Sequence, residues 1–266
     1  NMKNKKISQS FLKGYNEYKG KNLCGLKFKA QHFDNLQIKT TLPMDLGNYF
    51  EFHATGCLPR NGELPQAEKS YLGTKKECVS APYNRANESA KLFKKIKKAY
   101  NIEIVDVGLK LESKKKNGIL DIWAKMDGRP CIIDLKYSGV IDDKWSDFGW
   151  DVDSLHYKEK LLVQAIQYKM LVKENYGIDY KDFDFFFMVF SSKDVYDVKF
   201  LRINIDEDAF AIHDKHISSV YKQINAMNID KDFIAYPSIK SCHKCPLYIT
   251  CEYKSDIPLI EDVYYG

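Results

Sequence analysis

The sequence lacks any run of about eighteen apolar residues, the length that a membrane-spanning helix needs. It also lacks an apolar stretch in its first residues of the kind that a secretory signal peptide carries. We therefore expect no membrane partner and a cytoplasmic location. Internal repeats, low-complexity tracts and the phosphate-binding pattern G-x-x-x-x-G-K-[S/T] are missing too, and the last absence excludes a helicase motor.

A strong excess of one charge sign is also missing, because the formal net charge is only +5 over 266 residues. This mildly basic balance does not by itself indicate nucleic acid. Lysines do gather in two short clusters, at residues 94–98 and 114–116. Each cluster could attract a polyanion, or it could be a solvated helix face or loop.

Seven cysteines occur in a chain without a signal peptide, which favours a metal site over a disulfide framework. Three of them, Cys242, Cys245 and Cys251, follow the spacing C-x₂-C-x₅-C towards the end of the sequence. Three thiolates leave a four-ligand site incomplete. One interpretation is a structural zinc completed by His243 or by a fourth cysteine.

Apolar residues make up 44% of the chain, and their spacing predicts an α/β fold with a mixed sheet. We expect helices at residues 7–18, 40–56, 84–101, 154–177 and 207–227. We expect strands at residues 102–112, 118–126, 129–138, 182–192 and 197–205. A tight hairpin turn is predicted at 126–129, and the continuous apolar run at 182–192 is typical of a central strand. Residues 58–82 are rich in proline, glycine and polar residues and predict a long connection.

Two of the expected strands carry a carboxylate inside an apolar run, Asp121 and Asp134, and Lys136 follows the second. Side chains two apart on a strand point to the same side, so Asp134 and Lys136 project together. Pairing across the hairpin would bring Asp121 close to Asp134. Two close carboxylates repel unless a cation neutralises them, which a hard divalent ion does well. The alternative is a salt bridge at a sheet edge, which the apolar flanking residues disfavour.

This segment resembles the core of the PD-(D/E)XK nuclease superfamily, with Asp121 in a Gly-x-x-Asp pattern and Asp134–x–Lys136 after a hairpin. Downstream, Gln164 and Tyr168 are four residues apart and share one helix face. They resemble the Q-x-x-x-Y pattern of RecB-type nucleases, although an ordinary amphipathic helix can carry the same pair. The resemblance implies that Lys136 assists the attacking water or stabilises developing charge. It also implies that Gln164 and Tyr168 position the substrate or support Lys136.

RecB-type nucleases also carry an upstream Gly-x-x-x-His pattern whose histidine binds metal. Here Gly47 is followed four residues later by Glu51, and His53 lies on a different helix face. A carboxylate suits Mg²⁺ better than an imidazole does, so we take Glu51 rather than His53 as the ligand. The resemblance then implies one or two Mg²⁺ or Mn²⁺ ions, held by Glu51 and the two aspartates with the Leu135 carbonyl as a further ligand.

The cysteine trio resembles that of iron–sulfur nucleases: the CRISPR-associated RecB-like exonucleases, the AddB-type helicase–nucleases and their phage relatives. In these proteins a distant N-terminal cysteine joins the trio to hold a 4Fe–4S cluster. Cys24 follows an S-x-S-x-L arrangement as the family's ligand does, and Cys57 and Cys78 are the alternatives. Cys131 lies inside an expected strand and is interpreted as a core residue. The implied cluster ligands are Cys24, Cys242, Cys245 and Cys251, with zinc as the alternative metal.

The resemblance implies one restriction-endonuclease-like domain over residues 1–266, with a mixed central sheet flanked by helices. Its nuclease core would span 84–206, and a metal cluster would join cap segments at 7–57 and 236–252. The implied activity is metal-dependent hydrolysis of DNA, as an exonuclease on single strands, in a bacterial, archaeal or phage-infected cell. One alternative is a catalytically silent DNA-binding adaptor in a CRISPR-adaptation or phage recombination complex, and another is a nuclease acting on RNA. The complete set of carboxylates and lysine counts against the adaptor.

Overall fold

The structure is a computed structural model that describes residues 5–20, 23–34, 36, 40–60, 62–72, 76–139, 141, 155–228 and 231–257. The chain divides into two compact units. The sheet unit spans Thr40–His216, and the terminal unit combines Asn1–Lys39 with Ile217–Gly266. The expected nuclease core at 84–206 lies inside the sheet unit, and the three C-terminal cysteines lie inside the terminal unit.

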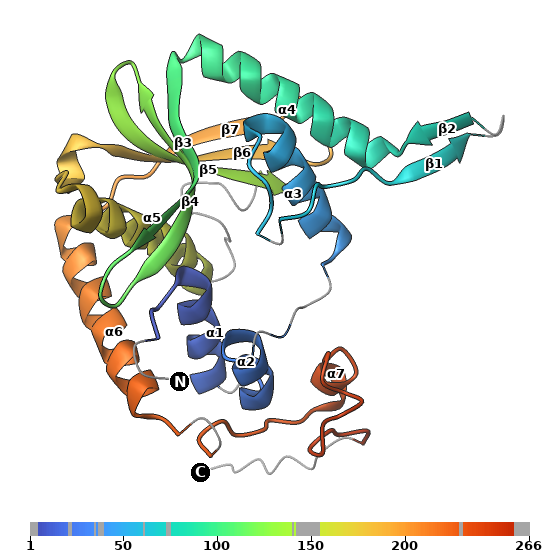
Figure 1. The fold of residues 1–266 in the computed structure, drawn as a ribbon, viewed down its shortest axis with the longest axis vertical. Helices are drawn as coiled ribbons and strands as arrows, with labels where there is room; N and C mark the ends of the chain where they lie inside the picture. Colours follow the sequence, from blue (N-terminus) through green and yellow to red (C-terminus); the bar gives the residue numbers. More distant parts are fainter. Residues whose placement is uncertain are drawn as a thin grey trace. The chain divides into compact units, whose positions relative to one another are not determined.

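A five-stranded mixed sheet forms the centre of the sheet unit (Figure 1). Its strands are β3 (Ile102–Glu112), β4 (Asn117–Met126), β5 (Arg129–Ser138), β6 (Asp184–Ser191) and β7 (Val198–Arg202). They lie side by side in chain order, with β5 and β6 parallel and the other neighbours antiparallel. The predicted mixed sheet is therefore confirmed, and the continuous apolar run forms the interior strand β6.

The turn between β4 and β5 fixes how these two strands pair. Asp127 and Gly128 both have positive φ, 49° and 80°. A two-residue type I′ turn requires this combination, which aspartate tolerates and glycine adopts freely. The ladder then runs from the turn to the pair Ile122–Ile133. The predicted hairpin turn at 126–129 is confirmed.

The connection predicted at 58–82 contains a small hairpin that the sequence analysis missed. Strands β1 (Lys69–Leu72) and β2 (Lys76–Val79) pair antiparallel in a sheet of their own. Each strand is four residues long and mixes charged with apolar residues. Such a segment is too short for a clear periodic signal, so the prediction of a long connection at 58–82 did not include this hairpin.

Helices α3 (Leu42–Thr55) and α4 (Ala81–Ala99) cover one face of the sheet, and α5 (Leu155–Tyr176) covers the other (Figure 1). Both α3 and α4 carry a proline in the first turn, where its fixed φ suits a helix start. Helix α3 ends at Gly56, whose left-handed φ of 82° favours glycine. A short 3₁₀ helix, Tyr180–Asp182, precedes β6. The three helices predicted for this unit are confirmed, and no helix among the described residues has the length and apolar character of a membrane span.

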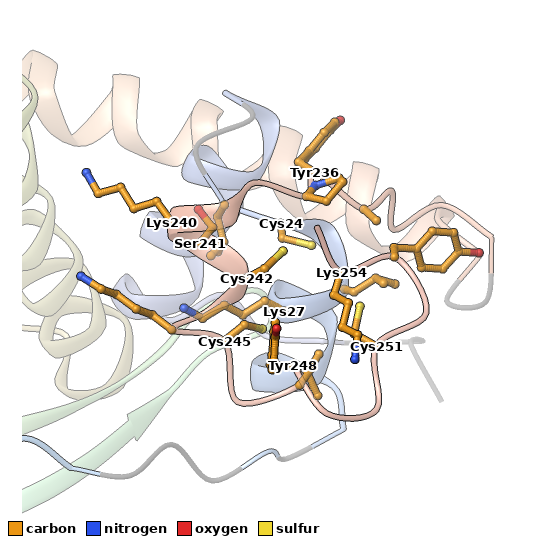
Figure 2. A pocket seen from close by; sticks show the side chains of 17 residues that line it. Cys24, Lys27, Tyr236, Lys240, Ser241, Cys242, Cys245, Tyr248, Cys251 and Lys254 are labelled. Atoms are coloured by element: carbon orange, nitrogen blue, oxygen red, sulfur yellow. The ribbon is translucent and has the colours of Figure 1, made fainter. Parts of the chain in front are cut away.

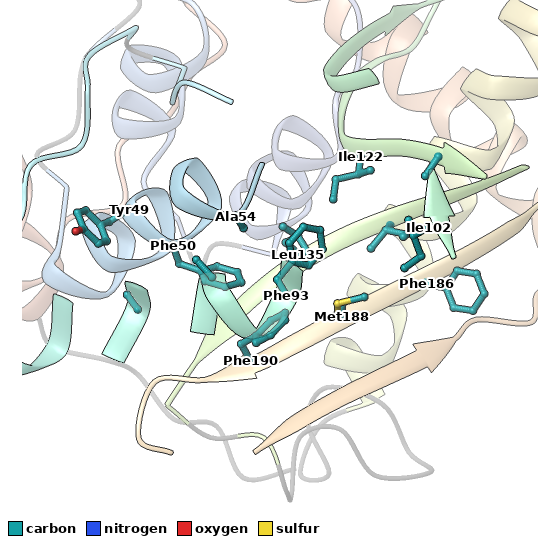
Figure 3. Close-up of a cluster of buried hydrophobic side chains, with 14 of the residues drawn as sticks. Tyr49, Phe50, Ala54, Phe93, Ile102, Ile122, Leu135, Phe186, Met188 and Phe190 are labelled. Carbon is teal, nitrogen blue, oxygen red and sulfur yellow. The ribbon is translucent and has the colours of Figure 1, made fainter. Parts of the chain in front are cut away.

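Alternation along β6 shows how the sheet separates two cores. Phe186 and Phe190 pack on the side of α3 and α4 (Figure 3). Phe185 and Phe187 pack on the side of α5. Successive side chains of a strand point to opposite faces, so a strand covered on both faces is apolar throughout. The functional carboxylates predicted on β4 and β5 therefore lie in strands that border two apolar layers.

The terminal unit is held together by aromatic residues. Its helices are α1 (Gln9–Lys19), α2 (Gly25–His32) and α7 (Ile239–Cys242). The ring of Phe28 lies 5.3 Å from that of Phe11 and stacks on Tyr18 at 5.6 Å. The Tyr18 hydroxyl donates a 2.7 Å hydrogen bond to the carbonyl of Asp232, which ties α1 to the C-terminal segment. The predicted helix near the N-terminus is confirmed, whereas α2 and α7 were not predicted.

Helix α6 (Glu207–Ala226), which confirms the last predicted helix, begins in the sheet unit and contributes there to a cluster of ion pairs around a buried lysine. Lys116 is only 3% exposed, and its ammonium lies 2.6 Å from a carboxylate oxygen of Glu174 and 3.0 Å from one of Asp214. Neither interpretation of the 114–116 lysine cluster holds for this residue, because its charge is enclosed by the protein. The sequence alone does not show that acidic residues far along the chain reach it.

Candidate active site

Strands β4 and β5 part just beyond the pair Ile122–Ile133, and the first carboxylate lies at that point. The backbone N–H of Leu135 donates a 2.9 Å hydrogen bond to the side chain of Asp121. Leu120 packs on the α5 face while Ile122 packs on the α3 face, so the alternation of β4 changes at Asp121. A buried backbone N–H needs a partner, and here a carboxylate supplies it. This accounts for a charged residue inside an apolar strand.

Asp134 is the most deeply buried of the predicted ligands, at 1% exposure. Both of its carboxylate oxygens are occupied: one by the ammonium of Lys136, the other by the side-chain amide of Gln164. The first contact follows from the strand period, which puts positions two apart on the same side. The second comes from α5. Asp134 therefore contacts both Lys136 and Gln164 directly.

Glu51, on α3, interacts electrostatically with the same carboxylates. Burial, followed by the charges of the two aspartates, raises the pKa of Glu51 to about 8. His53 faces other groups, because its ring lies 4.2 Å from that of Tyr49. Burial and then the charge of Lys94, not a carboxylate, lower the pKa of His53. The structure thus groups Glu51, and not His53, with the two aspartates.

The carboxylates of this site are short of positive charge. Burial raises the pKa of Asp134 to about 7, although the ammonium of Lys136 opposes the change. Burial also raises the pKa of Asp121, against Lys136 and the N–H of Leu135. Burial alone would lower the pKa of Lys136, but the two aspartates reverse that effect and raise it. Lys136 therefore stays protonated, and of the three acids its ammonium forms an ion pair with Asp134.

Tyr168 lies beside Gln164 on α5 and packs against β4. A Cβ atom on Gly118 would lie 2.8 Å from the ring of Tyr168 and 2.9 Å from Leu171, so only glycine leaves room for the ring. Burial raises the pKa of Tyr168, the aspartate charges add to this, and a hydrogen bond with Gln164 acts in the opposite direction. Through that bond the phenol orients the amide that contacts Asp134.

The donor set fits a hard divalent cation in its chemistry. Within the described ranges no three acidic, histidine or cysteine side chains converge closely enough to hold one metal ion. At the predicted site Lys136 and Gln164 occupy the oxygens of Asp134, and the Leu135 N–H occupies one of Asp121. One buried and two partly buried carboxylates beside one ammonium nevertheless suit an oxygen-ligated Mg²⁺ or Mn²⁺ ion.

Two further residues lie near the carboxylates and were not predicted, Arg60 and Cys57. The charge of Arg60 lowers the pKa of Glu51 and of Asp121, partly opposing the larger effect of burial. The Cys57 thiol has a raised pKa, first from burial and then from the charges of the same two acids. Both residues follow α3 in an irregular segment, where neither the regular side-chain spacing of a helix or strand nor a sequence motif predicts their position.

The four predicted cluster cysteines line one cavity of the terminal unit, with a volume of about 360 Å³ (Figure 2). Cys242 ends α7, Cys245 and Cys251 follow it, and Cys24 immediately precedes α2. None of the described lining residues is acidic. The basic residues that line the cavity are Lys27, Lys240, Lys244 and Lys254. An anionic occupant such as a thiolate-ligated metal centre suits this lining.

Gly25 holds Cys24 close to the C-terminal segment. Its backbone N–H donates a 2.9 Å hydrogen bond to the carbonyl of Ile234. A Cβ atom on Gly25 would lie 2.3 Å from that same oxygen, so no side chain fits. Glycine at this position is therefore explained by the close approach of the two backbones.

The other three cysteines belong to the sheet unit. The sulfur of Cys57 lies 2.6 Å from where a Cβ atom of Gly108 would stand, and Cys78 is part of β2. Cys131 is 1% exposed in the core on the α3 side, and burial raises the pKa of its thiol to about 12. The prediction that Cys131 is a core residue is confirmed.

The fold is shared with a protein of known structure. The crystal structure of a "putative exonuclease" from Eubacterium rectale matches with a TM-score of 0.56 and 15% sequence identity, over 83% of this chain and 81% of the other. The crystal structure of SSO0001 matches with a TM-score of 0.30 and 13% identity, over 63% of this chain and 68% of the other, which is too low to indicate a shared fold. No protein-family profile and no curated protein sequence matches the chain.

Proposed function

We propose that the protein is a metal-dependent nuclease of the PD-(D/E)XK type that hydrolyses phosphodiester bonds in DNA, acting as an exonuclease on single strands. One observation carries the proposal. The buried carboxylate of Asp134 on β5 and the partly buried ones of Glu51 on α3 and Asp121 on β4 act on one another around the protonated Lys136, at the point where two strands part. The fold shared with a protein named as an exonuclease agrees with this activity.

Each residue of the site has a distinct task in this proposal. Glu51, Asp121 and Asp134 would hold Mg²⁺ or Mn²⁺, with the Leu135 carbonyl as a further ligand. A bound ion of this kind polarises the scissile phosphate and lowers the pKa of water. The ammonium of Lys136 would hold a proton beside the attacking water or stabilise negative charge on the phosphate.

Gln164 and Tyr168 would act on the orientation of Asp134 rather than on the phosphate. The amide of Gln164 contacts the carboxylate directly, and the phenol of Tyr168 supports the amide. Fixing a ligand through a second layer of hydrogen bonds is a common way to tune a metal site.

The terminal unit would hold a 4Fe–4S cluster through Cys24, Cys242, Cys245 and Cys251. Each cysteine of such a cluster ligates a different iron, so the four thiols need to surround a cavity rather than one ion. A single tetrahedral zinc would require the thiols to converge on one point. The shared cavity and its lysine lining therefore favour the cluster over zinc.

The nuclease assignment is tested with end-labelled and circular DNA and RNA, single- and double-stranded, in Mn²⁺, Mg²⁺ or EDTA. Linear single-stranded DNA should be shortened from an end when either metal is present and left intact in EDTA. Binding without cleavage of any substrate would replace the nuclease with the DNA-binding adaptor. Faster cleavage of RNA than of DNA would show that RNA, not DNA, is the substrate.

The cluster is tested on protein purified without oxygen. The protein should be brown and hold about four irons per chain. Cys24→Ser should lose the colour, while Cys57→Ser, a matched change in the sheet unit, should keep it. A colourless protein with one bound zinc would contradict the cluster, and full iron in Cys24→Ser would exclude Cys24 as a ligand.

A further inference from the structure

A cavity of about 500 Å³ opens between the start of α3 and the segment that follows that helix. From the α3 side it is lined by Thr40, Asp45 and Asn48. From the other side it is lined by Pro59, Glu63, Leu64, Pro65 and Gln66. All of these residues belong to the sheet unit, so the cavity lies within one compact body.

The lining of this cavity does not suit a phosphate. Its polar groups are a hydroxyl, two carboxamides and two carboxylates, and none of the described lining residues is basic. Carboxylates repel phosphate oxygens. Asparagine and glutamine, in contrast, present paired donors and acceptors that match the edges of nucleobases, and a carboxylate accepts from their amino groups. The chemistry therefore favours a base over the sugar–phosphate chain.

Apolar side chains at the cavity and next to its lining are unusually exposed. Leu64, which lines the cavity, is 63% exposed, and Met44, beside the lining residue Asp45, is 53% exposed. Leu42 and Leu58 are each 47% exposed and lie within two residues of the lining. Exposed apolar residues that gather at one place mark a binding surface more often than scattered ones do. The flat face of an unstacked base is a suitable partner for them.

The cavity adjoins the proposed catalytic carboxylates. Asn48 precedes Glu51 by three residues on α3, so the two side chains share one helix face about 5–6 Å apart. On the other wall, the lining residue Pro59 is followed directly by Arg60, whose charge acts on Glu51 and Asp121. Arg60 thus directly follows a lining residue of the cavity and lies near enough to act on two of the proposed catalytic acids.

We propose that this cavity binds one unstacked nucleobase of the strand being cut, with the adjoining phosphate at Arg60. The inference rests on the proposed nuclease function and names the part of the substrate that the site reads. A base inside a duplex is stacked on both faces and cannot enter, so occupation of the cavity would make the enzyme select unpaired ends.

The experiment is a double-mutant cycle between the protein and the DNA, measured as binding in EDTA by fluorescence anisotropy. A twelve-nucleotide oligodeoxyadenylate is compared with versions that lack one base at each position in turn. We expect loss of one particular base, or of its neighbour, to weaken binding to the full-length protein by about 10-fold. Asn48→Ala and Leu64→Ala should weaken binding of the intact oligonucleotide by about the same factor. Ile212→Ala, 67% exposed on α6, is the matched control for Leu64→Ala and should bind as the wild type does.

The decisive quantity is how the two losses combine. If the missing base and the missing side chain belong to one contact, the doubly changed pair should bind no worse than either single change. Fully additive losses, or equal weakening at all twelve positions, would overturn the base pocket while leaving the nuclease assignment intact. Cleavage in Mn²⁺ is measured in parallel on the same oligonucleotides. A normal binding cycle without cleavage would instead overturn the proposed function and keep the pocket.

Discussion

Two lysines of the sheet unit, Lys136 and Lys116, lie beside carboxylates, yet their surroundings differ. Lys116 bridges Glu174 and Asp214, whose side chains are 35% and 47% exposed. Lys136 contacts Asp134, which is 1% exposed, and interacts electrostatically with Asp121 and Glu51 as well. The half-exposed carboxylates beside Lys116 keep much of their hydration. The acids around Lys136, one buried and two partly buried, share one ammonium, which leaves a deficit of positive charge. We interpret the first arrangement as structural and the second as a site for a cation and a phosphate.

Activity should separate the two lysines most strongly. Lys136→Ala should lower the cleavage rate by about 10²- to 10⁴-fold, because the site loses its proton carrier and charge stabiliser. Asp134→Ala should be similarly inactive, and both variants should stay folded by circular dichroism. Lys116→Ala, corrected for its folded fraction, should cleave at close to the wild-type rate. Wild-type turnover by Lys136→Ala would remove the distinction on which the catalytic assignment depends.

A smaller but still large effect should divide the two residues of α3 that compete as metal ligand. Glu51→Ala should reduce cleavage by about 100-fold and raise the Mn²⁺ concentration needed for half-maximal rate, since it removes one of three carboxylates. His53→Ala is the matched control and should leave both quantities nearly unchanged, because its ring faces Tyr49. The reverse pattern would show that the histidine is the ligand.

The two lysines also differ in how far their surroundings could be predicted from the sequence. Asp121, Asp134 and Lys136 could be predicted because the strand period and a two-residue turn fix their relation within 20 residues of chain. Lys116 could not, because its burial depends on α5 and α6. The hairpin β1–β2 was not predicted because its strands are too short to show a periodic pattern. The position of Arg60 was not predicted because irregular backbone has no regular spacing of side chains. Residues close together in the sequence determine local geometry, whereas the surroundings of a charge depend on how distant elements pack.

The free energy of unfolding should depend more on Lys116 than on an exposed lysine. Lys116→Ala should lower the free energy of unfolding by about 1–2 kcal/mol, measured by urea denaturation, because it removes an enclosed side chain together with both of its ion pairs. Lys91→Ala, which breaks an exposed pair with Glu88, should cost less than about 1 kcal/mol. Equal losses in the two variants would mean that Lys116 is no more structural than a surface lysine.

The pH dependence gives a finer test of the charge deficit. The pKa values of Glu51 and Asp134 are raised to about 8 and about 7, so the folded protein binds more protons than the unfolded chain between about pH 4 and 8. In EDTA, the stabilising contribution of these protonated acids is complete below this window and is lost as the pH rises through it, by on the order of 2 kcal/mol.

Neutral replacements provide the control for this pH effect. Asp134→Asn and Glu51→Gln should flatten the profile of unfolding free energy against pH, and Mn²⁺ at pH 8 should restore stability to the wild type only. A wild-type profile that stays flat in EDTA across the window would contradict the raised pKa values.

The two-residue turn at Asp127 and Gly128 limits how the hairpin that carries the site can vary in length. Insertion of a single residue into β4 or β5 would shift the register by one and turn Asp121 or Asp134 towards the wrong layer. Residues added in matched pairs, one on each strand, would lengthen the hairpin but keep both acids at the point where the strands part. Functional relatives of this protein should therefore differ in the length of this hairpin by even numbers of residues.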